Sequence, residues 1–266
     1  MTDVNQKYSN LGTGTLYLVP APLDFGCAEQ APLTDVLPDL TLRQAAALQH
    51  WVCENAKTTR AYLKRVQAIY PLPCALQDMA ITELPREAHK KGDHVGASSF
   101  DAKPLLKAAL AGHDIGLVSE AGMPAVADPG SSVVRAAHEL GVPVLPLVGP
   151  VSLLLALAAS GLNGQNFAFV GYLPQDAVDR KKRLQDLEQL AHKTSQTQLF
   201  IETPFRNAAL WRGLLEGLQP QTRLAISYGI SLAHGGHFSQ TVKAWRQSHP
   251  SACPAGDLPA VFGLGR

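Results

Sequence analysis

The stretch DIGLVSEAGMPAVADPGSSVVRAAHELGVPVLPLVGPVSLLLALAASG, residues 114–161, decides the fold of this chain. It predicts a buried strand at residues 115–118, a loop, and a helix at 133–140 that Gly141 ends. A second strand is predicted at 142–148, followed by a turn and a helix at 153–160. Strands alternating with helices in this way indicate an α/β fold with a parallel sheet and right-handed crossovers.

Two loops of small residues and prolines follow these strands: Ser119-Glu120-Ala121-Gly122-Met123-Pro124, and Gly149-Pro150. In a parallel sheet, ligands bind outside the carboxyl ends of the strands, where both loops would lie. Small residues suit a pocket built from backbone groups. Composition alone leaves open the alternative that these loops are only tight turns.

The order of the motifs along the chain is more specific than the composition of the loops. S-E-A-G-M-P-A-V-A-D-P-G at 119–130, G-P-V-S at 149–152, F-A-F-V-G-Y-L-P at 167–174 and E-T-P-F-R at 202–206 follow one another along the chain. They resemble the tetrapyrrole methylase superfamily of class III S-adenosylmethionine-dependent methyltransferases. The nearest look-alike is the small-subunit ribosomal RNA methyltransferase I family, with S-D-A-G-T-P-x-x-x-D-P-G and P-G-P-S in the same order.

This resemblance implies a two-domain tetrapyrrole-methylase-like fold and a homodimer. A parallel-sheet domain is expected at residues 1–162. A mixed-sheet α/β domain is expected at 163–266, closing a cleft that holds S-adenosylmethionine. The cofactor-binding residues carried over are those of the motif loops: Pro22, Ser119, Ala121, Gly122, Met123, Pro124, Gly149 and Pro150.

The first strand, expected at residues 15–19, is followed by the loop P-A-P-L-D at 20–24. Relatives carry G-x-G-P-G-D or T-P-I-G-N in this place. Pro22 and Asp24 fall at matching positions, but the glycines are missing, so the backbone loses freedom to approach a ligand. An ordinary proline-rich turn is the alternative interpretation.

The second loop, E-N-A-K-T-T-R at residues 54–60, resembles the family's E-D-T-R-x-T. A ribose hydroxyl needs a positioned base or charge to lose its proton. Glu54 and Lys57 keep the family chemistry and are the predicted catalytic residues. The alternatives are that Glu54 caps a helix or pairs with Lys57 on the surface, and that Thr58 or Thr59 caps a helix at 60–68.

The resemblance also assigns Arg60, Glu202 and Arg206 to substrate binding. The family's R-E-L-T-K stretch is replaced here by S-Y-G-I-S at 227–231. The departures at 55–56 and 227–231 predict a substrate or target position that differs from the usual ribosomal RNA site.

A run of four cations, Arg180 to Arg183, stands in a predicted helix that Asp179 would cap and that ends near His192. Cations at a helix N-terminus oppose the macrodipole, at about 0.3–1 kcal/mol each. The run therefore indicates an anionic partner such as RNA, although a solvated charged face is the common alternative.

The bulk composition agrees with a soluble, cytoplasmic protein. Of its 266 residues 46% are hydrophobic and 17% charged, and the net charge is +1, so no strong electrostatic signal for nucleic acid or membrane stands out. The four cysteines form no C-x-x-C pair, which favours free thiols in a reducing compartment and no metal. The polar N-terminus does not look like a signal peptide, and prolines interrupt the apolar stretch at 142–161.

Three functional hypotheses remain. The first is an S-adenosylmethionine-dependent methyltransferase that acts on RNA at a ribose 2'-hydroxyl. The second is a methyltransferase of the same fold that acts on a tetrapyrrole or another small molecule. The third is a non-catalytic relative that binds the cofactor or RNA. The chain has neither G-x-G-x-x-G nor G-x-x-x-x-G-K-[ST], which disfavours a dinucleotide enzyme and an NTPase.

Overall fold

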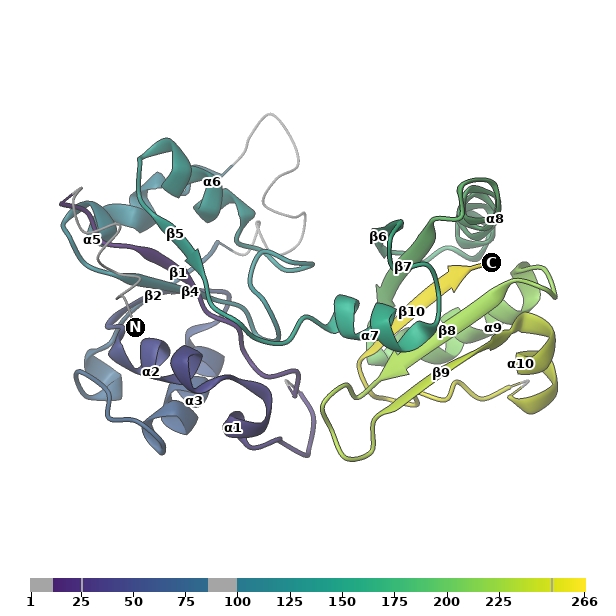
Figure 1. Cartoon of the computed structure of the whole chain (residues 1–266), viewed down its shortest axis with the longest axis horizontal. Helices are drawn as coiled ribbons and strands as arrows, with labels where there is room; N and C mark the ends of the chain where they lie inside the picture. The colour runs from purple at the N-terminus through teal and green to yellow at the C-terminus, as the bar shows by residue number, and fades with distance from the viewer. Residues whose placement is uncertain (1–11, 25, 86–99, 250) are drawn as a thin grey trace. The chain divides into compact units, whose positions relative to one another are not determined.

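The computed structural model describes residues 12–24, 26–85, 100–249 and 251–266. By its contacts the chain divides into two units (Figure 1): residues 1–25 with 31–151, and residues 26–30 with 152–266. Each unit is built around one five-stranded sheet. Within the described residues, no helix is both long and apolar enough to cross a bilayer.

The first unit contains five strands, five α-helices and two 3₁₀ helices among its described residues. In chain order these are β1 Leu16–Leu18, α1 Leu33–Val36, α2 Asp39–Ala47, β2 His50–Cys53, α3 Ala56–Gln67, the 3₁₀ helix Leu76–Asp78, β3 Ala80–Glu83, the 3₁₀ helix Lys103–Leu106, α5 Lys107–Leu110, β4 Ile115–Val118, α6 Ser131–Glu139 and β5 Val144–Pro146.

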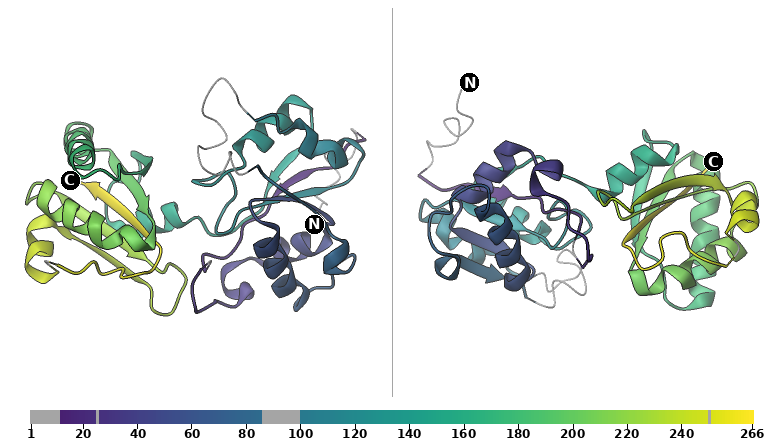
Figure 2. Two further views of the ribbon diagram at one scale, coloured as in Figure 1. Left: turned by 180° about the vertical axis from the view of Figure 1, so that it is seen from behind. Right: turned by 90° about the horizontal axis from the view of Figure 1, so that it is seen from below.

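The first sheet is wholly parallel, with the strand order β3-β2-β4-β1-β5. Helices cover both of its faces, with α2 and α3 on one side and α5 and α6 on the other (Figures 1 and 2). One core packs Leu42, Trp51 and Leu63 under α2 and α3, and the other packs Leu106 and Val133 on the opposite side. Burial on both faces explains why β4 reads as an unbroken apolar run.

The second unit carries the rest of the chain. Its elements are α7 Ser152–Ser160, β6 Phe167–Tyr172, α8 Ala177–Thr194, β7 Thr197–Glu202, the 3₁₀ helix Pro204–Arg206, α9 Asn207–Gly217, β8 Arg223–Tyr228, β9 Gly236–Thr241, α10 Val242–Ser248 and β10 Ala260–Gly265.

The second sheet is mixed, with the order β6-β7-β10-β8-β9. β6 and β7 are parallel, whereas β10 runs antiparallel to both β7 and β8, and β9 is antiparallel to β8. α8, α9 and α10 supply one large core, in which Trp211 and Trp245 meet edge to face. A parallel sheet in one unit and a mixed α/β sheet in the other confirm the predicted fold class.

Helix α7 belongs to the second unit, where it contacts β8, β9 and β10. The contacts therefore divide the chain after Val151. The domain boundary at 162/163 stays a prediction.

Two helix predictions need correction. The sequence LRQAAALQHW at residues 42–51 predicts a helix, but α2 ends at Ala47 and Trp51 lies within β2. Its indole is buried opposite Gly116 of β4, where an added Cβ would lie 2.6 Å from the ring. The missing side chain of Gly116 makes room for this ring, and this long-range fit outweighs the helical pattern.

Helix α8 starts at Ala177, earlier than predicted. Asp176, not Asp179, is its N-cap and accepts hydrogen bonds from the backbone N–H groups of Val178 and Asp179. The cation run from Arg180 therefore lies beyond the first three residues of the helix. Because the dipole effect is confined to the first turn, the argument from unfavourable dipole interactions no longer holds for the whole run.

Candidate active site

Three loops meet at the carboxyl edge of the first sheet. Ala21, after β1, forms a two-residue bridge with Gly122, after β4, through hydrogen bonds of 2.9 and 3.0 Å. Gly149, after β5, lies against Pro20 so closely that an added Cβ would be 2.3 Å from Pro20 Cγ. The sheet thus brings together the loops that hold all eight predicted cofactor-binding residues.

Gly122 is required where these loops cross. Its φ of +71° is a conformation that side-chain-bearing residues rarely adopt. An added Cβ would lie 3.2 Å from Leu23 and 3.5 Å from the Pro150 carbonyl oxygen. The pocket of backbone groups that the Gly/Pro motifs predicted at this edge stays a prediction.

Glu54 stands beside the same edge because of strand register. Cys53 of β2 pairs with Val118 of β4, so the next residues, Glu54 and Ser119, follow neighbouring strands. Glu54 Oε1 and Ser119 Oγ are both buried, and neither completes a hydrogen bond of good geometry. Ser119 nevertheless lies close enough to the Glu54 carboxyl to lower its pKa.

Other effects outweigh Ser119. Burial, followed by the nearby Asp128 and Glu120 carboxyls, raises the pKa of Glu54 to about 8. Burial and then Glu120 raise the pKa of Asp128 to about 7. Glu54 therefore holds its proton near neutral pH, and a modest change in its surroundings would ionise it.

Asn55 sets the start of α3 directly after Glu54. Its side-chain oxygen accepts from the backbone N–H groups of Lys57 and Thr58, at 2.9 and 3.3 Å. The predicted caps, Thr58 and Thr59, lie inside the helix and donate to the Asn55 carbonyl. The asparagine that departs from the family motif thus has a structural role.

Lys57 and Arg60 are exposed on α3. No ion pair joins Glu54 to Lys57 in the described part of the chain. Thr58 instead links α3 to the β4 loop by donating to Glu120 Oε1 at 3.3 Å. Both roles proposed for these residues, catalysis for Lys57 and substrate binding for Arg60, stay predictions.

Sequence reasoning missed the role of Arg65. Its guanidinium makes two hydrogen bonds to the carboxylate of Asp24, at 3.1 and 3.0 Å, and a third to the Ala31 carbonyl at 2.6 Å. Asp24 is 3% exposed. This contact ties α3 to the loop after β1 and occupies Asp24, which falls at a matching position of the family motif. Nothing local in the sequence pairs these two residues.

Sequence reasoning also missed Asp128, although its D-P-G motif was a visible signal. It stands in the loop between β4 and α6, near Ala125 and Ala127, which both have positive φ values of 63° and 65°. This loop conformation costs conformational energy in non-glycine residues. It places the Asp128 carboxyl close to Glu54 and Glu120.

The two remaining predicted residues, Glu202 and Arg206, lie in the second unit. Arg206 donates to Glu202 Oε1 from Nε and Nη2, at 2.7 and 2.6 Å. Glu202 also accepts from the backbone N–H of Thr203 at 2.7 Å. The pair rigidifies the turn after β7, and its substrate-binding role stays a prediction.

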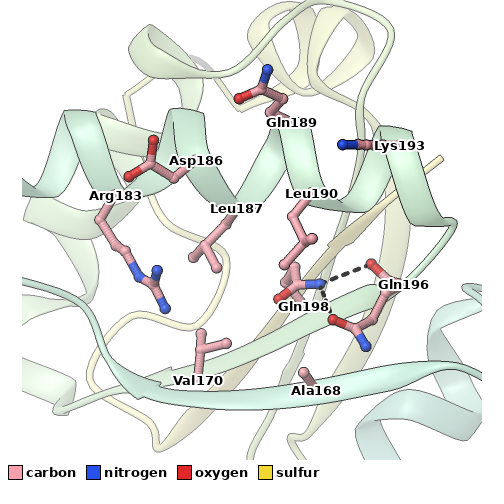
Figure 3. A pocket seen from close by; sticks show the side chains of 10 residues that line it. All are labelled: Ala168, Val170, Arg183, Asp186, Leu187, Gln189, Leu190, Lys193, Gln196 and Gln198. Atoms are coloured by element: carbon pink, nitrogen blue, oxygen red, sulfur yellow. Dashed lines mark hydrogen bonds between the residues drawn. The ribbon is translucent and has the colours of Figure 1, made fainter.

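A surface hollow of about 470 Å³ lies elsewhere, between α8 and β6 (Figure 3). Val170, Leu187 and Leu190 form its apolar part, with Arg183 and Lys193 at the border. None of the predicted catalytic or cofactor-binding residues lines it. Within the described residues, no group of three or more His, Cys, Asp or Glu side chains could hold a metal ion.

Comparisons with known proteins show which sequences and structures this chain resembles. The family model described as Tetrapyrrole (Corrin/Porphyrin) Methylases matches residues 37–243. A ribosomal RNA small subunit methyltransferase I of Streptococcus pyogenes serotype M6 is 31% identical over 73% of this chain and 57% of its own length. The protein of that name from Mesorhizobium japonicum is 29% identical over 93% of this chain and 74% of its own length. The chain thus spans little more than half of the streptococcal relative.

Solved structures show the same fold. The methyltransferase CobJ aligns with a TM-score of 0.54 and 16% identity, covering 96% of this chain and 95% of its own. Uroporphyrin-III C-methyl transferase from Thermus thermophilus, complexed with S-adenyl homocysteine, aligns with a TM-score of 0.52 and 19% identity. The alignment covers 95% of this chain and 98% of that one. At these identities the likeness concerns the fold alone.

Proposed function

This chain belongs to the tetrapyrrole (corrin/porphyrin) methylase family, and from that membership we propose that it is an S-adenosylmethionine-dependent methyltransferase that acts on RNA. The acceptor is a ribose 2'-hydroxyl. The RNA substrate is supported by the relatives named ribosomal RNA small subunit methyltransferase I. The observation that carries the proposal is the half-buried Glu54 carboxyl, with Oε1 out of contact with solvent, beside the three converging loops.

The arrangement of the loops supports the proposed cofactor site. The two hydrogen bonds between Ala21 and Gly122 hold the loops after β1 and β4 together, and the buried Ser119 hydroxyl lies beside the Glu54 carboxyl. Pro22, Ala121, Met123, Pro124, Gly149 and Pro150 complete the proposed binding residues. When bound there, S-adenosylmethionine supplies an electrophilic methyl group.

Glu54 has the properties of a general base that is protonated near neutral pH and acts once it is ionised. Its pKa of about 8 lies close to physiological pH, where proton acceptance is most effective. Once ionised, it accepts the proton of the acceptor hydroxyl. Lys57 lies three residues after Glu54, in the first turn of α3, and supplies positive charge for an RNA phosphate near the site.

The test is methyl transfer with tritiated S-adenosylmethionine to small ribosomal subunits from cells that lack ribosomal RNA small subunit methyltransferase I. We expect label in RNA, mapped to a ribose 2'-oxygen at a position that differs from the usual one. Glu54→Gln should lower kcat by about 10²–10⁴-fold. Label in a tetrapyrrole and none in RNA would overturn the RNA assignment and leave the methyltransferase assignment standing.

RNA contact also involves the second unit in this proposal. Lys181, Lys182 and Arg183 are exposed on α8. Arg180 is occupied, since its Nη1 donates to the Gln175 carbonyl at 2.9 Å. No ion pair to these three residues is found within the described parts of the chain, and three adjacent exposed cations suit an RNA backbone. Arg206, which pairs with Glu202, is the second residue of this unit that we propose to contact RNA.

We further infer a homodimer in the cytoplasm. Helix α7 leaves Leu154 and Leu155 exposed, together with Ala158 and Ala159, on one side of a helix that has no charged residue. An exposed apolar helix face of this kind is typical of a protein–protein interface. A second copy of the chain is the proposed occupant.

A further inference from the structure

The hollow between α8 and β6 owes its shape to a small residue on the edge strand of the second sheet. Ala168 of β6 pairs with Gln198 of β7, and both residues line the hollow. Leu187 and Leu190 extend from α8 toward these strands (Figure 3). Because the methyl group of Ala168 fills little of the space under the helix, a volume of about 470 Å³ stays open.

A chain of side-chain amides ends inside this hollow. Gln196 Nε2 donates to Asn166 Oδ1, and Gln198 Nε2 donates to Gln196 Oε1, both at 3.0 Å. Gln198 Nε2 also donates to the Gln196 carbonyl at 3.1 Å, so the orientation of the Gln198 amide is fixed. Gln198 is 0% exposed, and its Oε1 has no hydrogen-bond partner. Because an unpaired buried acceptor is costly, this oxygen points to a ligand that donates a hydrogen bond.

The charges around the hollow favour a negatively charged group at its border. Arg183 and Lys193 supply two cations and Asp186 one acid, so these lining residues carry a net charge of +1. All three side chains are exposed, and no ion pair involves them in the parts of the chain that the structure describes. In Figure 3 the Arg183 side chain extends toward Val170 of β6, whereas Asp186 lies on the side of α8 away from that strand. This arrangement places an anion beside Arg183.

The combined features match the parts of a nucleotide. A base has flat faces that pack on apolar side chains and an edge that carries hydrogen-bond donors, and its phosphate is an anion. The volume of the hollow also lies within the range of about 300–1,000 Å³ that is typical of ligand pockets.

Building on the proposed function, we propose that this hollow binds one unstacked nucleotide of the RNA substrate, whose base carries an exocyclic amino group. The amino group donates to Gln198 Oε1, the faces of the base contact Val170 and Leu190, and Arg183 contacts the phosphate. Because Gln198 is closed to solvent in this structure, entry of the base requires exposed side chains at the border to turn aside. The hollow thereby adds base recognition to a surface of α8 that otherwise attracts RNA by charge alone.

Binding of single-stranded oligonucleotides tests this site apart from catalysis. The full-length protein is titrated into fluorescein-labelled oligo(C) and oligo(U) of equal length, and fluorescence anisotropy is recorded over a range of salt concentrations. Cytosine carries an amino group where uracil carries a carbonyl oxygen, so the wild type should bind oligo(C) about 2–10-fold more tightly. Gln198→Leu should abolish this preference and leave the salt dependence unchanged, because no phosphate contact is lost.

A second variant keeps the test decisive should Gln198→Leu fail to fold, as checked by thermal melting. Ala168→Leu fills the hollow from β6 and should weaken binding of oligo(C) to the level of oligo(U). Arg183→Ala should instead flatten the logarithmic salt slope by about 0.7. The matched control is Gln185→Leu, the same change at an exposed position of α8 outside the hollow, and it should retain the wild-type preference.

Equal affinities of the wild type for the two oligonucleotides, or a preference that persists in both hollow variants, would overturn the inference. Cytidine monophosphate that binds as tightly as oligo(C) would make the hollow a site for a free nucleotide and would also overturn it. Methyl transfer to small ribosomal subunits decides the proposed function separately. Labelled RNA without any preference for oligo(C) refutes the hollow alone, whereas the absence of labelled RNA removes the RNA assignment and this inference with it.

Discussion

At the scale of single residues, the Glu54 carboxyl is suited to catalysis, but its ionisation lowers the stability of the folded protein. This carboxyl is half-buried beside two other acids, so ionisation is opposed by desolvation and by like charge. Proteins tolerate such groups mainly where function requires them. Because ionisation of Glu54 is opposed in the folded protein, its effect can be measured in unfolding experiments, without any assay of activity.

Glu54→Gln should remove a pH-dependent loss of stability. The folded-state pKa of about 8 exceeds the usual value of 4.5. The contribution of the protonated Glu54 carboxyl to the stability of the folded protein is therefore fully present below about pH 4.5 and is lost as pH rises through 8. The variant should match the wild type near pH 5 and be more stable at pH 9 by an amount on the order of 1–3 kcal/mol. Urea unfolding at both pH values measures this. Parallel pH profiles for the two proteins would contradict the prediction.

Gly149→Ala tests the contact between loops. The new Cβ would lie 2.3 Å from Pro20 Cγ and must push the loop after β1 away from that after β5. We expect a loss of about 1–3 kcal/mol in the free energy of unfolding, with weaker binding of S-adenosylmethionine. Gly164→Ala is the control, since an added Cβ there meets nothing within 4 Å. Unchanged cofactor affinity in Gly149→Ala would argue against this arrangement of loops.

At the scale of elements, α3 links three loops of the site. Its N-terminal residues follow Glu54 and reach Glu120 through Thr58. Further along, Arg65 holds the loop after β1 through Asp24. A helix is stiff enough to transmit position between its turns, so the loops after β1, β2 and β4 are held in one arrangement.

Arg65→Leu should destabilise the protein by about 3–5 kcal/mol, because it leaves the Asp24 carboxylate, 3% exposed, without a partner. The double variant Asp24→Asn/Arg65→Leu should recover part of that loss, since the uncompensated charge is gone. Thermal or urea unfolding of both single variants and the double variant gives the coupling free energy. Additive effects would show that the ion pair contributes nothing of its own.

At the scale of the whole molecule, partners are recognised by surfaces rather than by buried groups. Reversing the charge at Lys181, Lys182 and Arg183 should weaken RNA binding and flatten its dependence on salt, by about 0.7 in logarithmic slope per lost phosphate contact. Filter binding over a range of salt concentrations measures the slope. Lys182→Glu alone can be compared with Lys107→Glu, an exposed cation on α5. Equal slopes for these two variants would mean that the α8 run is only a solvated face.

Leu154→Glu tests the proposed dimer. A carboxylate on the apolar face of α7 would have to be desolvated on association, so light scattering at micromolar concentration should change from a dimer to a 28.4 kDa monomer. Val178→Glu, at an exposed position of α8, should leave the dimer intact. A wild-type protein that is already monomeric would contradict the proposal outright.

Local patterns in the sequence identified the family and part of the secondary structure. The strand at Ile115–Val118 was predicted with the bounds that the structure has. Such signals are local: apolar runs, caps and terminating glycines act on neighbouring residues. The Gly/Pro loops were identified because their motifs are contiguous, and a parallel sheet must place them at one edge.

Only the tertiary structure decided which distant residues meet. Glu54 lies near Asp128 because β2 and β4 are neighbours in the sheet, and Asp24 pairs with Arg65 because α3 packs beside the loop after β1. Trp51 belongs to a strand because Gly116 leaves room for its ring. No local propensity encodes these contacts, since each depends on strand order and packing between residues far apart in the chain. For the same reason the raised pKa of Glu54 could not be read from its motif.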